Sequence, residues 1–410
     1  MELAIFGGKP VFSETQPVGL PLVENDTIER YHRLLDKVFQ VNFLTNDGPL
    51  LRRLEEALSE RFRVKQAVVV TNATLAQMLI MRAEGINSGR VIIPTNTFIS
   101  TAHVCEWVGA VPVFADIDPL TLNLDPLEIR RLAVPDLVAV MPTHVFGVMA
   151  NLPTIIEEAK KLKLRVICDA AHAFDCDAGG SGPGGCGVPE FLSFHATKFF
   201  STFEGGAILT NDPDLAREMR ELRNFGFAGI DDVSALGINA KMTEAAAAFG
   251  LASLPALEAR RERLRLVHAA YQQSLAGIQG VRLHDFSQGK NNHRYFPIFI
   301  EDSFGASRDA VCQALWQENI LVRRYFYPGC HRMRYYARKT PGGPIPLPQA
   351  DKVLGKILCL PTSFAELPDL EGVKRLSDCL ARLQKAAPAV EKYWREYSGE
   401  VNLENTEESH

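Results

Sequence analysis

Long apolar runs, paired cysteines and an excess of basic residues are all missing from this chain of 410 residues. No apolar run approaches the length of a membrane span, so we expect no membrane partner. The N-terminus, Met1 to Gly8, has neither the basic start nor the long apolar core of a signal peptide. We therefore expect a cytoplasmic protein.

The eight cysteines are scattered, and none forms a Cys-x-x-Cys pair. Zinc sites and disulfide frameworks usually need such spacings, so we predict no metal and no disulfide scaffold. A net charge of −5 gives no overall basic footprint, which argues against a nucleic-acid partner. We also find no internal repeat.

From about residue 50 onward, short apolar segments alternate with helical patterns. The predicted strands are almost wholly apolar and cover 67–71, 91–94, 111–116, 137–142 and 165–169. Apolar residues recur at helical spacing over 24–40, 51–62, 74–83, 100–108, 152–162 and 212–223. This alternation predicts an α/β fold with a mostly parallel central sheet, helices on both faces and ligands at the carboxyl ends of the strands.

The pattern changes after residue 210, and this change suggests how the chain is divided. A long helical stretch is predicted over 243–276, and a strand at 295–300 and a helix at 308–318 open a smaller domain. We expect an N-terminal arm and helix (1–45), a large α/β domain (46–250), a small C-terminal α/β domain (251–397) and a disordered acidic tail (398–410). The glycine-rich loop 179–187 is either a surface excursion or a functional element.

One lysine and one aspartate follow neighbouring apolar strands. Lys198 ends the segment Phe194 to Lys198, just before the flexible Glu204-Gly205-Gly206, and Asp169 ends the strand at 165–169. Such a pair suits pyridoxal 5′-phosphate, because the lysine forms an imine with the cofactor and the aspartate holds the pyridine nitrogen protonated. A solvated surface charge for Lys198 and a helix cap for Asp169 are the alternatives.

Further residues near these strand ends could complete a cofactor site. Asn72-Ala73-Thr74 opens a helix whose free amides could hold a phosphate, although capping alone would explain Thr74. Ser193 could add a hydroxyl to that phosphate. Phe98 could stack on the pyridine ring or belong to the core, and His172 could bond the cofactor's phenolic oxygen or merely support its loop.

Several of these pieces occur in the order typical of one family. They are Asn72-Ala73-Thr74, residues 94–98, 111–116, Asp169-Ala170-Ala171-His172, Phe194 to Lys198, Glu204-Gly205-Gly206 and Asn239 to Glu244. Over roughly residues 40–385 the chain resembles the DegT/StrS-type sugar aminotransferases. The resemblance implies fold type I, like aspartate aminotransferase, with the cofactor on Lys198. It also implies a homodimer with shared active sites, in which Asn239 reaches the phosphate of the neighbouring subunit.

Within the family, residues 44–50, 203–206, 223–227, 325–331 and 360–362 look similar to one branch. That branch aminates carbon 4 of dTDP-4-keto-6-deoxy-D-glucose with L-glutamate on the desosamine route. The resemblance implies dTDP-4-amino-4,6-dideoxy-D-glucose and 2-oxoglutarate as products. The freed Lys198 amine would then act as general base and acid. Family dehydratases carry histidine at the lysine position, so Lys198 argues against that branch.

Other functions stay open at this point. Another keto sugar could be the acceptor, with a C3 ketone or a GDP or UDP carrier, and so could a hexose phosphate or an inosose. A non-catalytic regulatory homologue is a different class, as is a cysteine lyase using Cys330. His144 either lines the site or is a satisfied core histidine, and the basic, aromatic run 331–339 is either a diphosphate-binding or a solvated face.

Overall fold

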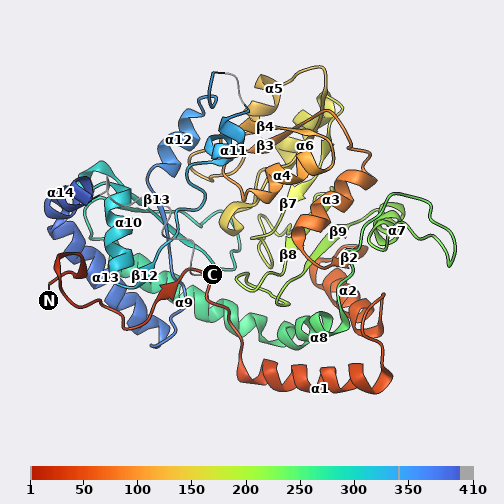
Figure 1. Cartoon of the computed structure of the whole chain (residues 1–410), viewed down its shortest axis with the longest axis horizontal. Helices are drawn as coiled ribbons and strands as arrows, with labels where there is room; N and C mark the ends of the chain where they lie inside the picture. The colour runs from red at the N-terminus through yellow and green to blue at the C-terminus, as the bar shows by residue number, and fades with distance from the viewer. Residues whose placement is uncertain (1, 340–341, 398–410) are drawn as a thin grey trace.

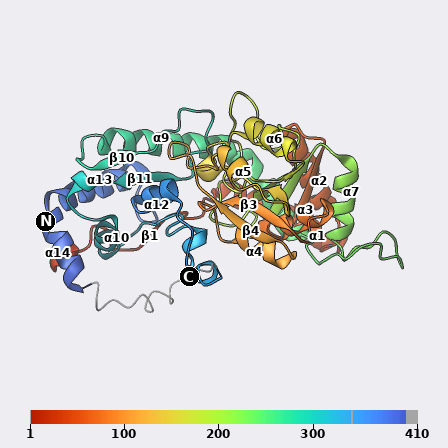
Figure 2. The same ribbon diagram turned by 90° about the horizontal axis from the view of Figure 1, so that it is seen from above.

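The computed structural model describes residues 2–339 and 342–397. A large twisted sheet with its helices forms one end of the molecule (Figure 1). A smaller sheet forms the other end with α9 (Leu257–Leu275), α10 (Arg308–Gln317), α13 (Asp369–Lys385) and α14 (Ala387–Tyr397). Figure 2 shows these two groups of elements side by side along the long axis. The predicted acidic tail lies outside the described residues.

The large sheet consists of two ladders that join at one strand. The first ladder has the order β4 (Val111–Ala115), β3 (Arg90–Pro94), β5 (Leu137–Val140), β6 (Arg165–Val166). The second has the order β7 (Cys168–Asp169), β8 (Glu190–Ser193), β9 (Gly206–Thr210), β2 (Gln66–Val70).

The predicted strand 165–169 is divided into β6 and β7, yet its backbone stays bonded to one neighbour. Ile167 N–H donates to Val140 at 3.2 Å, and Asp169 N–H donates to Pro142 at 2.8 Å. β9 is antiparallel to both of its neighbours, and the other pairs are parallel. The mostly parallel sheet is therefore as predicted.

Helices cover both faces of this sheet, which explains its apolar strands. Val68 and Val70 of β2 pack in the same cluster as α3 (Ala73–Ala83), α4 (Ser100–Trp107) and α7 (Pro213–Leu222). Ala67 and Val69 face the opposite way, toward α2 (Pro49–Phe62) and α8 (Glu244–Ser253). On this second side, α5 (Leu127–Arg131) and α6 (Leu152–Lys161) cover β5 and β6.

The predicted helical stretch over 243–276 is confirmed, but it is not one continuous helix. It is divided into α8, a 3-10 turn at Leu254–Ala256 and α9, because Pro255 lacks the amide hydrogen that an unbroken helix would use. The division lets α8 lie against α1 (Asn25–Val41) while α9 continues toward the small sheet (Figure 1).

The smaller sheet has the order β10 (Val281–Leu283), β11 (Phe296–Ile300), β13 (Ile357–Leu360) and is antiparallel. The N-terminal arm lies on this part of the chain, since β1 (Gln16–Pro17) pairs with β12 (Ile320–Leu321). The short helices α11 (Arg334–Ala337) and α12 (Pro348–Leu354) pack instead with the core of the large sheet, where Tyr336 contacts Phe114 of β4. None of the helices in the described part of the chain combines the length and apolar character that crossing a bilayer requires.

Candidate active site

Lys198 lies in a closed loop between β8 and β9. The loop is pinned at its ends, because Phe194 N–H donates to Gly205 and Thr202 N–H donates to Phe194, both at 2.8 Å. The partly buried Lys198 points its amine at the Tyr295 hydroxyl, with Nζ 3.1 Å from the oxygen. The alternative of a solvated surface lysine is therefore wrong.

The surroundings of Lys198 favour its uncharged form. Burial is the largest cause, and together with the positive charge of Arg294 it lowers the pKa of Lys198 to about 8. The Asp169 carboxylate acts in the opposite direction. Because the ordinary lysine pKa is near 10.4, a far larger fraction of this amine is free to act as a nucleophile or base at neutral pH.

Asp169 is buried at the carboxyl end of β7. Its Oδ1 accepts the Ala171 amide at 2.9 Å, and its Oδ2 accepts the Thr101 hydroxyl at 3.2 Å. Thr101 belongs to a chain of buried hydroxyls, in which Thr97 is 3.0 Å from Thr101 and Thr143 donates to Thr97 at 3.1 Å. Burial raises the pKa of Asp169. No salt bridge to Asp169 occurs in the described residues, so this carboxylate could bind a cationic N–H.

His172 lies beside Lys198 among aromatic rings. Its ring centroid is 4.3 Å from that of Tyr295, and it stacks on Phe146 at 6.0 Å. Burial, followed by the Lys198 charge, holds the pKa of His172 well below its usual range, so the ring is neutral. The Phe146 amide donates to Nδ1 at 3.2 Å. Nε2 therefore carries the proton and could donate it to an oxygen of a ligand.

The start of α3 lies directly beside the glycine pair after the lysine loop. A Cβ added to Gly206 would stand 2.9 Å from the Ala73 nitrogen, so glycine allows this close approach. Ser193 is opposite Gly206 in the β8–β9 ladder. The helix cap is Asn72, whose Oδ1 accepts the Leu75 amide at 2.9 Å.

Capping therefore does not explain Thr74. Its side chain is exposed at the helix start. The amides of Ala73 and Thr74 belong to the first turn, where no helical carbonyl can accept them. With the nearby Ser193 they form a site that could bind a phosphate group.

Phe98 and Asn239 both present side chains to the surface. Phe98 is 57% exposed, which rules out the alternative of a core residue, and its ring centroid lies 6.4 Å from that of Phe326. Asn239 is exposed, and its Oδ1 lies 3.5 Å from the Lys241 amide, at the limit of hydrogen bonding. An exposed flat ring and a loosely held amide could each contact a bound group.

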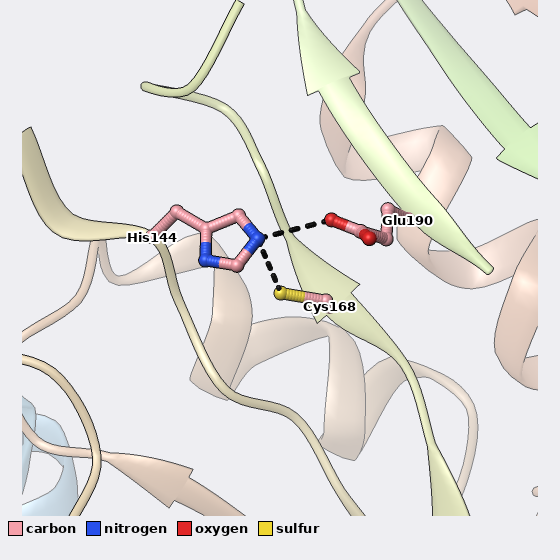
Figure 3. A group of neighbouring side chains, drawn as sticks. All are labelled: His144, Cys168 and Glu190. Carbon is pink, nitrogen blue, oxygen red and sulfur yellow. Dashed lines mark hydrogen bonds and ion pairs between the residues drawn. The ribbon is translucent and has the colours of Figure 1, made fainter. Parts of the chain in front are cut away.

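His144 is a core histidine rather than a residue of this site. Its Nε2 lies 3.0 Å from a Glu190 oxygen and 3.4 Å from the Cys168 sulfur, and all three side chains are fully buried (Figure 3). Nδ1 accepts the Ala150 amide at 2.9 Å, so Nε2 carries the proton and donates it to the carboxylate. A protonated nitrogen cannot bind a metal, although the three groups lie within 4.8 Å of one another.

Part of the glycine-rich loop 179–187 is packed on this cluster and is not a surface excursion. The Gly184 amide donates to the second Glu190 oxygen at 2.7 Å, and Gly184 has a φ of +82°. A Cβ there would stand 2.5 Å from a methyl group of Val64. Glycine is therefore needed where this loop closes the cluster.

Two other sequence-based candidates have structural roles. Cys330 is fully buried, and burial raises the pKa of its thiol to about 12, so it is no mobile nucleophile. In the basic run, Lys339 pairs with Glu106 and Arg332 with Asp351. These paired charges favour the solvated-face interpretation of the run.

Sequence reasoning missed Tyr295, Thr101 and Arg294. Tyr295 is 97 positions from Lys198, and no spacing rule links a residue before one strand to a loop of a different sheet. Thr101 had a weak signal, because it follows the strand end at 94–98 where ligands were expected. Arg294 had no sequence signal other than being a charged residue before an apolar strand.

Comparisons with known proteins agree with this geometry. The family model for DegT/DnrJ/EryC1/StrS aminotransferases matches residues 25–378. A dTDP-4-amino-4,6-dideoxy-D-glucose transaminase of Shigella dysenteriae is 37% identical over 86% of this chain and 94% of its own. One of the same name from Escherichia coli is 35% identical over 85% and 94%. The crystal structure of DesI with its TDP-sugar product is 38% identical, with a TM-score of 0.90 over 96% of this chain and 99% of its own.

Proposed function

The chain belongs to the DegT/DnrJ/EryC1/StrS aminotransferase family, and we propose that it aminates carbon 4 of dTDP-4-keto-6-deoxy-D-glucose with L-glutamate. It is a pyridoxal phosphate-dependent aminotransferase with the fold of the sugar aminotransferases. The proposed products are dTDP-4-amino-4,6-dideoxy-D-glucose and 2-oxoglutarate. The two relatives named dTDP-4-amino-4,6-dideoxy-D-glucose transaminase, which are 37% and 35% identical to this chain, carry the choice of sugar.

The residues at the site fit pyridoxal phosphate. The Asp169 carboxylate is buried without an ion pair in the described residues, as a partner of a pyridinium N–H would be. The first amides of α3, beside Gly206, suit the phosphate. The exposed ring of Phe98 suits stacking on the cofactor ring, and the Nε2 proton of His172 suits its phenolic oxygen.

The proposed roles follow from these contacts. When bound, the cofactor supplies an electron sink for the carbon that loses its proton. The Lys198 amine would hold the cofactor covalently at rest. Once released, it would take the proton from the α-carbon of glutamate in the first half-reaction and deliver a proton to carbon 4 of the sugar in the second. Asp169 holds the proton on the ring nitrogen. Asn72, Ala73, Thr74 and Ser193 orient the phosphate.

A homodimer with shared sites is also part of the proposal. Asn239 follows a loop that exposes an unusual number of large apolar side chains, namely Phe225, Phe227, Ile230, Val233 and Leu236. Single exposed apolar residues are common, but a group of this kind typically marks an interface. A second copy covering the loop would bring Asn239 to its phosphate. A cytoplasmic location is likewise proposed.

The test follows the visible absorption of the purified protein through both half-reactions. We expect a yellow protein that L-glutamate bleaches and that dTDP-4-keto-6-deoxy-D-glucose restores, with the amino sugar identified by mass spectrometry and NMR. Matched acceptors are a dTDP-linked 3-keto sugar and GDP- and UDP-linked 4-keto sugars. A higher kcat/KM on any of these would overturn the proposed substrate. A protein that stays colourless with added cofactor would favour the non-catalytic homologue.

A further inference from the structure

Two buried arginines hold the backbone on either side of Lys198. Arg294 donates from Nε to the Thr197 carbonyl at 2.8 Å. Arg260 donates from Nη1 to the Phe199 carbonyl, also at 2.8 Å. Both side chains are nearly inaccessible, at 1% and 3% exposed. The residues that flank the lysine are thus fixed by two guanidinium groups.

The same two arginines bind the segment that precedes α1. Arg260 forms a two-pronged ion pair with Glu24, at 2.7 and 3.0 Å. Arg294 instead donates from Nη2 to the Leu20 carbonyl at 2.7 Å. Next to it, Gly19 has a φ of +85°, and a Cβ there would stand 3.1 Å from the Cβ of Thr197. The arm therefore lies directly on the lysine loop.

The two sites differ in charge. Glu24 balances Arg260, whereas Arg294 has no carboxylate partner in the described residues, and its Nη1 has no hydrogen-bond partner there. The titratable groups that act on Arg294 besides Arg260 are Tyr295, Tyr325 and Cys359. Burial raises the pKa of each of these three, to about 12 for Tyr325 and Cys359, so all are uncharged at neutral pH.

The Arg294 charge therefore acts on the Lys198 amine without a carboxylate partner of its own in the described residues. The other groups that interact with its amine are the Asp169 carboxylate, the neutral His172 and the hydroxyl of Tyr295. Two buried positive charges repel each other strongly, and the lysine can lose its charge far more easily than the arginine can. The repulsion between the two charges disappears when Lys198 loses its proton.

We propose that Arg294 is a positioning residue: it fixes the lysine loop through the Thr197 carbonyl, and its charge, which has no carboxylate partner in the described residues, raises the fraction of the Lys198 amine that is uncharged and able to bond the cofactor. This inference rests on the proposed role of Lys198. It does not depend on which sugar the enzyme uses.

The test measures how fast cofactor-free protein attaches pyridoxal 5′-phosphate, followed by visible absorption as a function of pH. In the wild type the rate should rise with a midpoint near 8, where Lys198 loses its proton. R294Q keeps an amide donor and removes the charge. Its midpoint should rise by about half a unit or more, which slows attachment at pH 7 by roughly threefold or more. R294K keeps the charge and should keep the wild-type midpoint.

The matched control is the double variant E24Q/R260Q, which alters the second clamp with no change in net charge. It should leave the midpoint unchanged, whatever it does to thermal stability. A folded R294Q with the wild-type midpoint would overturn the proposal. If R294Q does not fold, R294K provides the test. A raised midpoint for cofactor attachment in R294K would contradict the role of the charge, because this variant keeps the charge. A wild type that never attaches the cofactor at Lys198 would instead overturn the proposed function.

Discussion

Cys168 and Asp169 are neighbours on one strand, yet the polar groups around Cys168 are paired with one another and those around Asp169 are not fully paired. Successive strand residues face opposite sides of a sheet. The Cys168 side is closed, because the chain itself pairs His144 with Glu190 and Glu190 with the Gly184 amide (Figure 3). The Asp169 side is open, because its carboxylate, the Lys198 amine and the first amides of α3 lack full partners among the described residues.

The difference shows how buried polar groups can be assigned to stability or to function. A buried donor or acceptor without a partner costs free energy, so a chain that keeps several together must recover the cost when something binds. The closed cluster should therefore affect folding, and the open one should affect cofactor binding and turnover. Five variants test this contrast.

The largest effect is expected from K198A. Without the amine the cofactor has no covalent attachment and the α-proton has no base, so turnover should fall by at least about 10⁴-fold. Circular dichroism should show an intact fold, because Lys198 is not part of the core. Steady-state assays with L-glutamate measure the loss. Near-normal turnover would contradict the assignment of this lysine.

The adjacent pair D169N and C168A separates the two sides most sharply. D169N should lower kcat/KM by roughly 100-fold or more, because the ring nitrogen loses its anionic partner. Burial raises the pKa of Asp169, so its charged form costs stability at neutral pH, and D169N should leave the Tm of cofactor-free protein equal or higher.

C168A should behave in the opposite way. It should lower the Tm and change kcat/KM by no more than about twofold. Thermal melts and steady-state kinetics on the same preparations compare the two variants. A destabilised D169N together with an inactive C168A would reverse the assignment of the two sides.

E190A should be destabilising and otherwise mild. It leaves the His144 Nε2–H and the Gly184 amide without acceptors, at a cost of about 2–4 kcal/mol in the free energy of unfolding. Chemical denaturation measures this, with E157A as the surface control, since Glu157 is exposed in an (i, i+4) pair with Lys161. If cofactor affinity fell while stability held, the cluster would belong to the active site.

Y295F should have the smallest effect. It removes one hydrogen bond to the Lys198 amine and keeps the ring contacts with His172. A loss of about 1 kcal/mol corresponds to a roughly fivefold lower kcat/KM. Phe326 offers a control, because F326L alters the aromatic packing and leaves that hydrogen bond intact. An unchanged kcat/KM in Y295F, with a loss in F326L, would assign Tyr295 to packing alone.

The sequence was sufficient for residues whose roles follow from local pattern. Lys198 and Asp169 follow apolar strands, and parallel strands bring their carboxyl ends to one edge, so the pair could be predicted. The break at Pro255 could also have been predicted, because proline interrupts helical hydrogen bonding. The helical periodicity on both sides nevertheless favoured one continuous helical stretch. Tyr295 and Arg294 could not be predicted, because they reach the site only through the packing of the smaller sheet against the large one.

The central claim is that the incompletely paired groups around Asp169 and Lys198 bind the cofactor. Mapping the residue to which the cofactor is attached tests this claim most directly. The purified protein, loaded with pyridoxal 5′-phosphate, is reduced with borohydride, digested and mapped by mass spectrometry. We predict that the reduced cofactor is found on the peptide containing Lys198. In the D169N variant, we expect a smaller fraction of Lys198 to carry the cofactor. Attachment to another lysine, or none at all, would contradict the account.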